Sequence, residues 1–377
     1  PLSEYRALFP ALAAQGVYLN HAGVAPPSTR VRAAVLEWLE DVIAHGIRGE
    51  NEWEARAENV RGLAAKLLGS SPGEIAFVRS TSHGLGLVAE GLDWRPGDEV
   101  AICPEVEYPS NVYPWRHLAV RGVAVREVPA VRGGMTPEAL SRAIGPRTRL
   151  VAVSSVQYAS GHATDLPAIS RVCREAGALL CVDGIQSVGA FPLDVRAAGI
   201  DFLSADSHKW LLGLNGIGLL YVRQEVLDRV RPVLVGWKST TDAWNFNRVL
   251  YDLKQDAGKF EEGSPSYLGI YGLGATIELL LEIGVDRIAD RIRSVLARLE
   301  AGLAGSGAEV SPRPQERAGI VLVRVGGREE ALFGELSGKG FSVSLRRGAI
   351  RISPHFYTTD DEIDRLVEAI RAFSGRV

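Results

Sequence analysis

The chain has 377 residues with 42 basic and 45 acidic side chains, so its formal net charge is −3. This balance argues against nucleic acids and anionic membranes as partners, because both reward a clustered excess of Lys and Arg. The charge balance favours a small-molecule or protein partner. No apolar run approaches the ~20 residues that span a bilayer, and the N-terminal stretch lacks the layout of a secretion signal, so we expect a cytoplasmic protein.

From about residue 74 to residue 224 short β-branched runs alternate with helical patterns, and a further helical pattern precedes them at 31–45. The expected strands are 74–78, 99–103, 123–128, 149–154, 178–182, 201–205 and 216–222, and the expected helices are 31–45, 84–90, 110–121, 137–144 and 166–175. Strands that alternate with helices predict a mostly parallel sheet, because parallel strands need crossover connections. The fold class is therefore α/β.

The pattern changes after residue 224. A polar, aromatic stretch at 236–247 leads into a long helical segment at 268–303. Shorter runs at 319–325, 329–336, 348–352 and 360–373 then alternate between strand and helix. We predict an N-terminal segment over 1–30, a large domain over 31–270 and a smaller α+β domain over 271–377, with which the helix at 31–45 could pack.

Lysine is rare in this chain, since only six of the 42 basic residues are lysines. A chain that uses arginine for most of its cations keeps lysine by chance or where an amine must lose its proton. Lys209 stands out, because it follows an apolar run at the point where ligands of open α/β sheets bind. For an arbitrary lysine, an ordinary surface position is the expected alternative.

An acid precedes this lysine in the run Cys-Val-Asp183-Gly-Ile-Gln186, where an apolar strand ends in a carboxylate. Pyridoxal phosphate needs such a pair: a lysine for the Schiff base and an acid that keeps the pyridine nitrogen protonated. Gln186 could bond the 3-oxygen of the ring. The alternative for Asp183 is a turn or helix N-cap residue before Gly184.

A candidate phosphate site lies in the run Arg79-Ser80-Thr81-Ser82-His83, where a strand leads into a helix. Free backbone amides and the positive end of the helix dipole attract phosphate there, and Thr81 and Ser82 add hydroxyl donors. Helix capping by Ser80 or Thr81 would explain the same residues.

The order of these motifs resembles the class V aminotransferase family of fold type I pyridoxal-phosphate enzymes. That family includes cysteine desulfurases, selenocysteine lyases, kynureninases and isopenicillin N epimerase-like proteins. Further runs carry the resemblance: Glu-Tyr-Pro-Ser-Asn at 107–111, Ser-Val-Gln-Tyr-Ala-Ser-Gly at 155–161, Ser-His-Lys at 207–209 and Gly-Ser-Pro at 263–265. The resemblance implies a large domain with a seven-stranded sheet and a small C-terminal domain.

The resemblance also implies roles for single residues. Lys209 and Asp183 would be catalytic, and the N-terminal segment would line the active-site cleft. Cofactor contacts would come from Thr81, Ser82, Tyr108, Gln157, Asp183, Gln186, Ser207, Lys209 and, across a homodimer with shared active sites, Ser264. Substrate binding would come from Arg351, Asn20 and His21.

A cysteine is missing where desulfurases carry their nucleophile, because the run at 340–350 contains none. The chain has only Cys103, Cys173 and Cys181, each in or beside an expected strand or helix, without metal-ligand spacing. We therefore expect no metal site and no enzyme persulfide.

The remaining reactions share an external aldimine and a quinonoid formed when Lys209 removes the α-proton. We favour an aminotransferase over a Cβ–S or Cβ–Se lyase, and epimerisation stays open. A cofactor-binding regulator or scaffold is disfavoured because the lysine and the acid are both present, and a dehydrogenase because the nucleotide-binding glycine pattern is absent.

Overall fold

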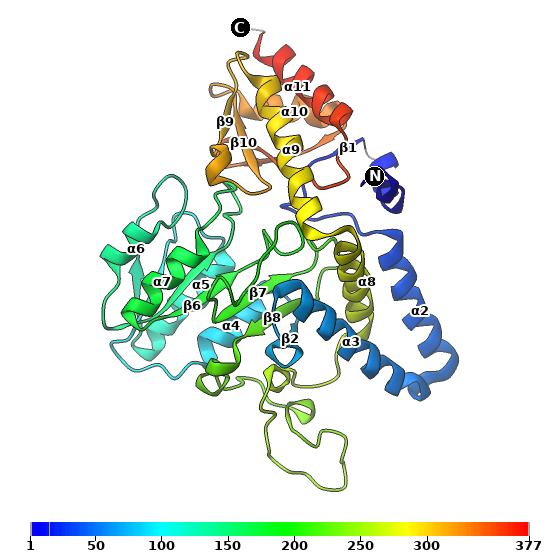
Figure 1. Ribbon diagram of the computed structural model, residues 1–377, viewed down its shortest axis with the longest axis vertical. Coiled ribbons are helices and arrows are strands. Elements are labelled where there is room, and N and C mark those ends of the chain that lie inside the picture. Colours follow the sequence, from blue (N-terminus) through cyan, green and yellow to red (C-terminus); the bar gives the residue numbers. More distant parts are fainter. Residues whose placement is uncertain (1, 15, 376–377) are drawn as a thin grey trace.

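A mostly parallel sheet forms the centre of the larger part of the molecule (Figure 1). The computed structural model describes residues 2–14 and 16–375, and within them seven strands pair in the order β2-β8-β7-β6-β5-β3-β4, with β8 antiparallel to both of its neighbours. The strands are β2 (Ile75–Val78), β3 (Glu99–Ile102), β4 (Ala124–Glu127), β5 (Thr148–Ser154), β6 (Leu179–Asp183), β7 (Phe202–Asp206) and β8 (Gly218–Val222). Every residue of β6, β7 and β8 is buried, as in strands that are covered on both faces. The predicted seven-stranded α/β architecture is confirmed.

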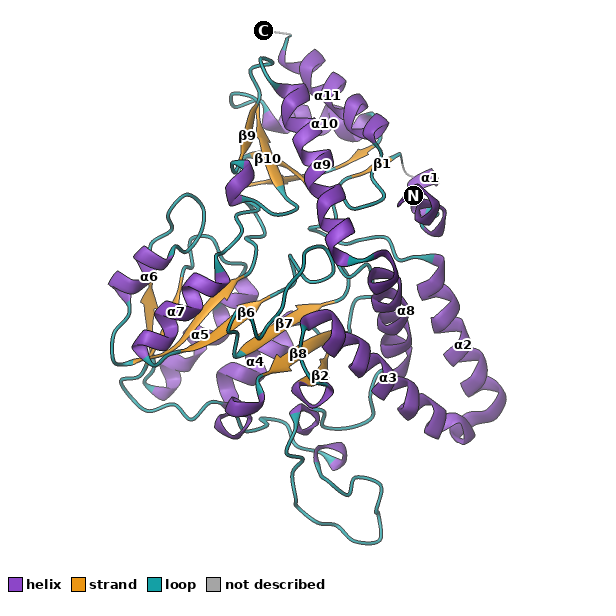
Figure 2. Ribbon diagram, viewed as in Figure 1, coloured by secondary structure: helices purple, strands orange, loops and turns teal. Residues whose placement is uncertain are grey.

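Helices cover this sheet (Figure 2). They are α4 (Thr81–Gly91), α5 (Tyr113–His117), α6 (Pro137–Ala143) and α7 (Leu166–Ala176), with α2 (Thr29–His45), α3 (Glu50–Leu68) and α8 (Tyr267–Ile283) at one side. Short 3₁₀ turns are η1 (Leu2–Leu8), η2 (Gly46–Gly49), η3 (Pro72–Glu74), η4 (Pro109–Asn111), η5 (Leu118–Arg121), η6 (Gln224–Arg229), η7 (Trp237–Ser239), η8 (Ala257–Phe260) and η9 (Pro314–Glu316). The sequence did not predict α3, whose exposed face is rich in charged residues.

The smaller part of the molecule is an antiparallel sheet in the order β12-β13-β10-β9, packed with three helices. Its elements are α9 (Val285–Leu303), β9 (Glu309–Ser311), β10 (Val321–Arg324), α10 (Glu329–Gly338), β11 (Phe341–Ser342), β12 (Ser344–Arg346), β13 (Ala349–Ile352) and α11 (Asp360–Ser374). The N-terminal segment, with α1 (Ala11–Ala14) and β1 (Val17–Tyr18), joins it because β1 pairs in parallel with β11.

The long helical segment expected over 268–303 is in fact two helices, α8 and α9, and our prediction of one continuous segment was wrong. They meet at Gly284, whose φ of +89° is a conformation that favours glycine, and the pair is bent by 76°. In residues 2–14 and 16–375 no single helix is long and apolar enough to cross a membrane, although this bent pair would be by length and composition.

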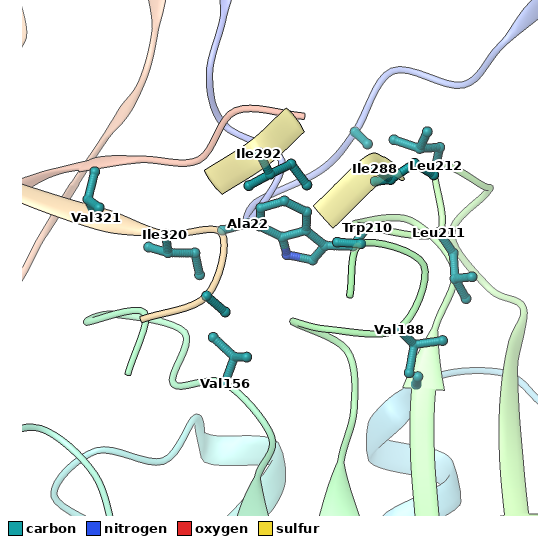
Figure 3. Packing of buried hydrophobic residues seen from close by; sticks show 14 of the residues in the cluster. Ala22, Val156, Val188, Trp210, Leu211, Leu212, Ile288, Ile292, Ile320 and Val321 are labelled. Carbon is teal, nitrogen blue, oxygen red and sulfur yellow. The ribbon is translucent and has the colours of Figure 1, made fainter. Parts of the chain in front are cut away.

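The bend separates two packing environments. α8 packs against α2 and α3, whereas α9 packs against α11 in the smaller part. The helix expected at 31–45 therefore lies along α8. Figure 3 shows the ring of Trp210 at the junction, close to Ile288 and Ile292 of α9, and all three belong to one buried cluster. The division of the chain at residues 30 and 270 stays a prediction.

Candidate active site

Three neighbouring strands bring polar side chains to one edge of the large sheet. β5, β6 and β7 run in parallel, and the register aligns Ser154 with Asp183 and Asp183 with Ser204. Asp206 ends β7, and Lys209 follows three residues later. The strand ends thus place the predicted acid and the predicted lysine at the same edge, as the spacing of their motifs implied.

A cavity of about 390 Å³ opens at this edge. Its lining includes these predicted residues: Thr81, Ser82, Tyr108, Asp183, Gln186, Lys209 and Arg351. Tyr158 and Arg346 also line it, and no role was predicted for either of them. Lys209 Nζ lies 5.6 Å from the centroid of the Tyr108 ring, so the phenol forms one wall beside the amine.

Burial shifts the pKa values of Asp183 and Lys209. It raises the pKa of Asp183 to about 7, with Glu107 adding to the rise and a hydrogen bond from Ile185 N (3.0 Å) and the charge of Lys209 opposing it. Burial lowers the pKa of Lys209 to about 8, against the raising effect of Asp183. An amine with this pKa is available as a base or nucleophile near neutral pH, and the buried carboxyl needs a cation beside it to stay ionised.

Two partners fix the orientation of the Gln186 amide. Trp210 Nε1 donates to Gln186 Oε1 at 2.7 Å, and Gln186 Nε2 donates to the carbonyl oxygen of Ala22 at 3.1 Å. Because an indole N–H can only donate and a carbonyl can only accept, the amide cannot turn over without losing both bonds. The second N–H of Gln186 is therefore the group that can bond a ligand oxygen in the cavity.

The helix α4 begins at the cavity. The Ser80 side chain caps the N-terminus of α4. The hydroxyls of Thr81 and Ser82 are therefore not needed for capping. The Thr81 hydroxyl accepts a bond from Asp206 N at 2.9 Å and keeps its own proton to donate, and Ser82 Oγ lies 2.7 Å from Ser110 Oγ. Hydroxyls and free amides at a helix N-terminus form a site that suits a phosphate.

Arg351 is a buried cation that is 2% exposed. Its Nε donates to Ser344 Oγ at 3.1 Å, and its other nitrogens donate to Tyr158 O at 2.8 Å and Asn20 Oδ1 at 3.2 Å. Burial lowers the pKa of Arg351 to about 10, with Arg346 adding to the effect. All three hydrogen-bond acceptors are neutral, so the guanidinium is suited to a ligand carboxylate. Asn20 reaches the site through Arg351.

Gln157 and Ser207 do not line the cavity, although we expected both to contact the cofactor. Gln157 Nε2 donates to Glu107 Oε1 at 2.8 Å, and the Ser207 hydroxyl donates to the carbonyl oxygen of Leu214 at 2.5 Å. Both side chains are buried among protein groups. These bonds give both residues a part in the loops around the site, while Gln157 Oε1 has no hydrogen-bond partner among the described residues, and contact of either residue with the cofactor stays a prediction.

His21 and Ser264 also lie away from the cavity. His21 is fully buried between Ser353 O (2.7 Å) and the Tyr357 hydroxyl (2.5 Å), and burial lowers its pKa to about 4. His21 joins the N-terminal segment to the smaller part of the molecule. Ser264 lines a different cavity, of about 330 Å³.

Glu107 lies in the run 107–111, and no role for it was predicted from the sequence. This buried carboxyl accepts bonds from Ser154 N (2.8 Å) and the Ser154 hydroxyl, from Gln157 Nε2 (2.8 Å) and from Asn111 Nδ2 (2.9 Å). The network fixes the loop that carries Tyr108 to the end of β5. Glu107 lies in the loop four residues beyond the expected strand 99–103, and its immediate neighbours in sequence do not point to this network.

The cysteines lie outside the cavity, as far as the described residues line it. Cys103, Cys173 and Cys181 are all at most 1% exposed. Burial raises the pKa of Cys103 and of Cys173 to about 12 and that of Cys181 well above its ordinary value. These thiols are structural and unreactive, since a thiolate is the nucleophilic form.

Known proteins share this architecture over almost the whole chain. The family model "Aminotransferase class-V" matches residues 17–366. A probable cysteine desulfurase of Methanothermobacter thermautotrophicus is 32% identical, covering 95% of this chain and 95% of that protein. The uncharacterized aminotransferase YcbU of Bacillus subtilis is 30% identical, covering 98% and 97%.

Solved structures agree with this similarity. The cysteine desulfurase CsdA of Escherichia coli superposes with a TM-score of 0.88 at 26% identity, covering 100% of this chain and 99% of that one. The cystine C-S lyase C-DES, in a complex with its product cysteine persulfide, superposes with a TM-score of 0.89 at 25% identity, covering 96% and 99%.

Proposed function

The chain belongs to the aminotransferase class-V family, and from that membership we propose that it transfers the amino group of an amino acid to a 2-oxo acid. It is a pyridoxal-phosphate-dependent enzyme that acts on an amino acid. One observation carries the choice of reaction. Lys209 and Arg351 line a cavity in which the described residues include no thiol, so the groups present support proton transfer and carboxylate binding.

The residues of the cavity fit pyridoxal phosphate. Thr81, Ser82 and the N-terminus of α4 would hold the phosphate, and Asp183 would hold the protonated ring nitrogen. The raised pKa of Asp183 supports this assignment, because a cationic ring supplies the charge that this buried carboxyl lacks. Gln186 would donate its second N–H to the ring oxygen. When bound, the cofactor supplies an electron sink and an aldehyde for the amine of Lys209.

The protein groups then have separate tasks. Arg351 binds the α-carboxylate of the substrate through two parallel hydrogen bonds, the geometry that a guanidinium provides. Lys209 Nζ accepts the proton from the substrate α-carbon, and its lowered pKa keeps a useful fraction of the amine unprotonated near neutral pH. Tyr108 places its ring beside the amine on one side of the cavity.

A Cβ–S or Cβ–Se lyase is the second candidate. It is favoured by the relatives, which are named as a probable cysteine desulfurase and a cystine C-S lyase. The buried cysteines of this chain would require the sulfur to leave with the substrate fragment, with no transfer to an enzyme thiol. Epimerisation needs the same first proton transfer and stays open.

The products of the pure holoenzyme distinguish these reactions. A panel of amino acids is incubated with and without pyruvate or 2-oxoglutarate, and new amino acids, 2-oxo acids and released sulfur are measured. We expect amino transfer that depends on the 2-oxo acid, and the C103A/C173A/C181A variant should retain it. Release of sulfur from cysteine or cystine without an acceptor, and no amino transfer, would replace our proposal by the lyase.

We also propose a cytoplasmic homodimer with shared active sites, in which Ser264 serves the phosphate of the neighbouring copy. Support comes from the exposed apolar side chains of the nearby loop, including Phe246 and Val249, which are 70% and 97% exposed. Inactive Lys209→Ala and Ser264→Glu chains should regain activity when mixed and allowed to exchange, because one site of the mixed dimer has both native residues. A mixture that stays inactive while mixed dimers form would contradict sharing.

A further inference from the structure

The hairpin of β12 and β13 projects two arginines from one face. Ser344 pairs with Arg351 across the hairpin, and their side chains share a hydrogen bond of 3.1 Å, so both lie on the same face. Arg346 is two residues from Ser344 on the same strand, and alternate side chains of a strand share a face. Arg346 is therefore a diagonal neighbour of Arg351, and both line the cavity that contains Lys209.

The charge of Arg346 is not balanced within the protein. Among residues 2–14 and 16–375 no carboxylate pairs with it, and its guanidinium donates to the backbone carbonyl of Leu345 at 2.8 Å. Its charge also acts on the site, since Arg346 lowers the pKa of Arg351 and of Lys209, in both cases behind the larger effect of burial. The acids that line the cavity, Asp183 and Asp206, belong to the ends of the sheet strands and not to this hairpin.

We propose that Arg346 binds a second anionic group, at the far end of the substrate side chain, so that this enzyme acts on acidic amino acids and the matching 2-oxo diacids. The inference rests on the proposed function, in which Arg351 takes the α-carboxylate and Lys209 the α-proton. A ligand with one anionic group would leave two neighbouring guanidinium charges with only one negative partner. A ligand with two anionic groups supplies one negative partner to Arg346 and one to Arg351. A carboxylate, sulfinate or phosphate at the far end of the side chain would have the required chemistry.

The position of Arg346 suits selection of substrate more than general stability. Its side chain is exposed, whereas Arg351 is buried, so Arg346 lies toward the solvent side of the cavity and Arg351 lies deeper. The adjacent Arg347 provides a comparison, because its guanidinium lies over the ring of Tyr158 at 5.9 Å and does not line the cavity. The two residues have the same charge and only one of them faces the site.

Isosteric substrate pairs test the proposal on the holoenzyme. We expect kcat/KM for aspartate or glutamate to exceed that for asparagine or glutamine by about tenfold or more. This is the loss of binding expected when one charged hydrogen bond is removed. Arg346→Ala should abolish that preference by lowering kcat/KM for the acidic member alone, and Arg346→Lys should restore part of it. Arg347→Ala removes the same charge and should leave the preference intact.

Binding without reaction gives a second readout. Calorimetry should show that succinate binds the holoenzyme more tightly than butyrate, and that Arg346→Ala removes the difference. Equal or better use of neutral amino acids, with equal binding of the two acids, would overturn this inference and leave the aminotransferase proposal standing. Absence of amino transfer with every amino acid in the panel would instead overturn the proposed function.

Discussion

The sheet edge and the β12–β13 hairpin contribute to the same cavity in different ways. At the edge, the buried Asp183 and the half-buried Lys209 are groups of opposite charge, each with a pKa displaced toward neutrality. On the hairpin, Arg346 and Arg351 have like charge and, in the described part of the chain, no carboxylate partner. Under the proposed function, the edge performs chemistry while the hairpin recognises anions, so we expect changes at the edge to lower kcat and changes on the hairpin to raise KM.

Loss of the lysine tests the edge most severely. Lys209→Ala should abolish turnover and prevent borohydride from fixing the cofactor to the chain, because the amine that bonds the cofactor and moves the α-proton is gone. Mass spectrometry of the reduced protein measures the adduct. The control is Lys66→Ala, since Lys66 is exposed on α3 and should leave both properties unchanged. A reduced adduct that persists in Lys209→Ala would place the bond on another lysine, such as Lys238 or Lys259.

Removal of the negative charge at the edge should have the next largest effect. Asp183→Asn keeps the size of the side chain but cannot stabilise a protonated ring nitrogen, so we expect kcat to fall by about 10²–10⁴-fold. Cofactor absorbance should persist in part through the phosphate contacts and Lys209. Steady-state kinetics with saturating cofactor measure the loss, and a kcat within a few-fold of the native value would end the assignment. Asp206 would then be the acid to test.

The hairpin should respond in KM. Arg351→Ala should raise KM for the amino acid by about 10–100-fold, since a two-bond contact with a carboxylate is lost. Arg351→Lys keeps the charge without the paired hydrogen-bond geometry, so its KM should lie between those of the native enzyme and Arg351→Ala. Full kinetic curves separate KM from kcat. A kcat that falls as far as in Asp183→Asn, with KM unchanged, would contradict the division of labour between edge and hairpin.

The apoprotein should show an effect on stability and not on turnover, as a dependence of its unfolding free energy on pH. The pKa of Asp183 in the folded chain, about 7, lies above its unfolded value near 4, so its protonated form is favoured by folding. The stabilisation is complete below about pH 4 and is lost as the pH rises to about 7, up to about 4 kcal/mol in all. Thermal unfolding between pH 5 and 8 measures this loss. Asp183→Asn should flatten it, and an equally steep curve in that variant would assign the loss to other groups.

Local sequence patterns predicted much of the large domain because its strands are short, apolar and separated by helical runs. Asp183 and Lys209 follow two such strands, and each could be recognised from its own neighbours. The hairpin offered no comparable pattern: β12 is three residues long, and Arg346 and Arg351 look like the other arginines of an arginine-rich chain. The break at Gly284 was also missed, because the apolar spacing continues through a single glycine.

The sequence alone therefore determined the cofactor chemistry of this protein, since a lysine, an acid and a phosphate turn occur in a recognisable order. Tertiary structure decided which residues share the cavity. Gln157, Ser207 and His21 were expected there, but each is bonded to protein groups that come from other parts of the chain. Arg346 reaches the cavity because the smaller domain packs over the sheet edge. A residue's neighbours in sequence fix its local conformation, whereas its burial and hydrogen-bond partners depend on contacts between distant segments.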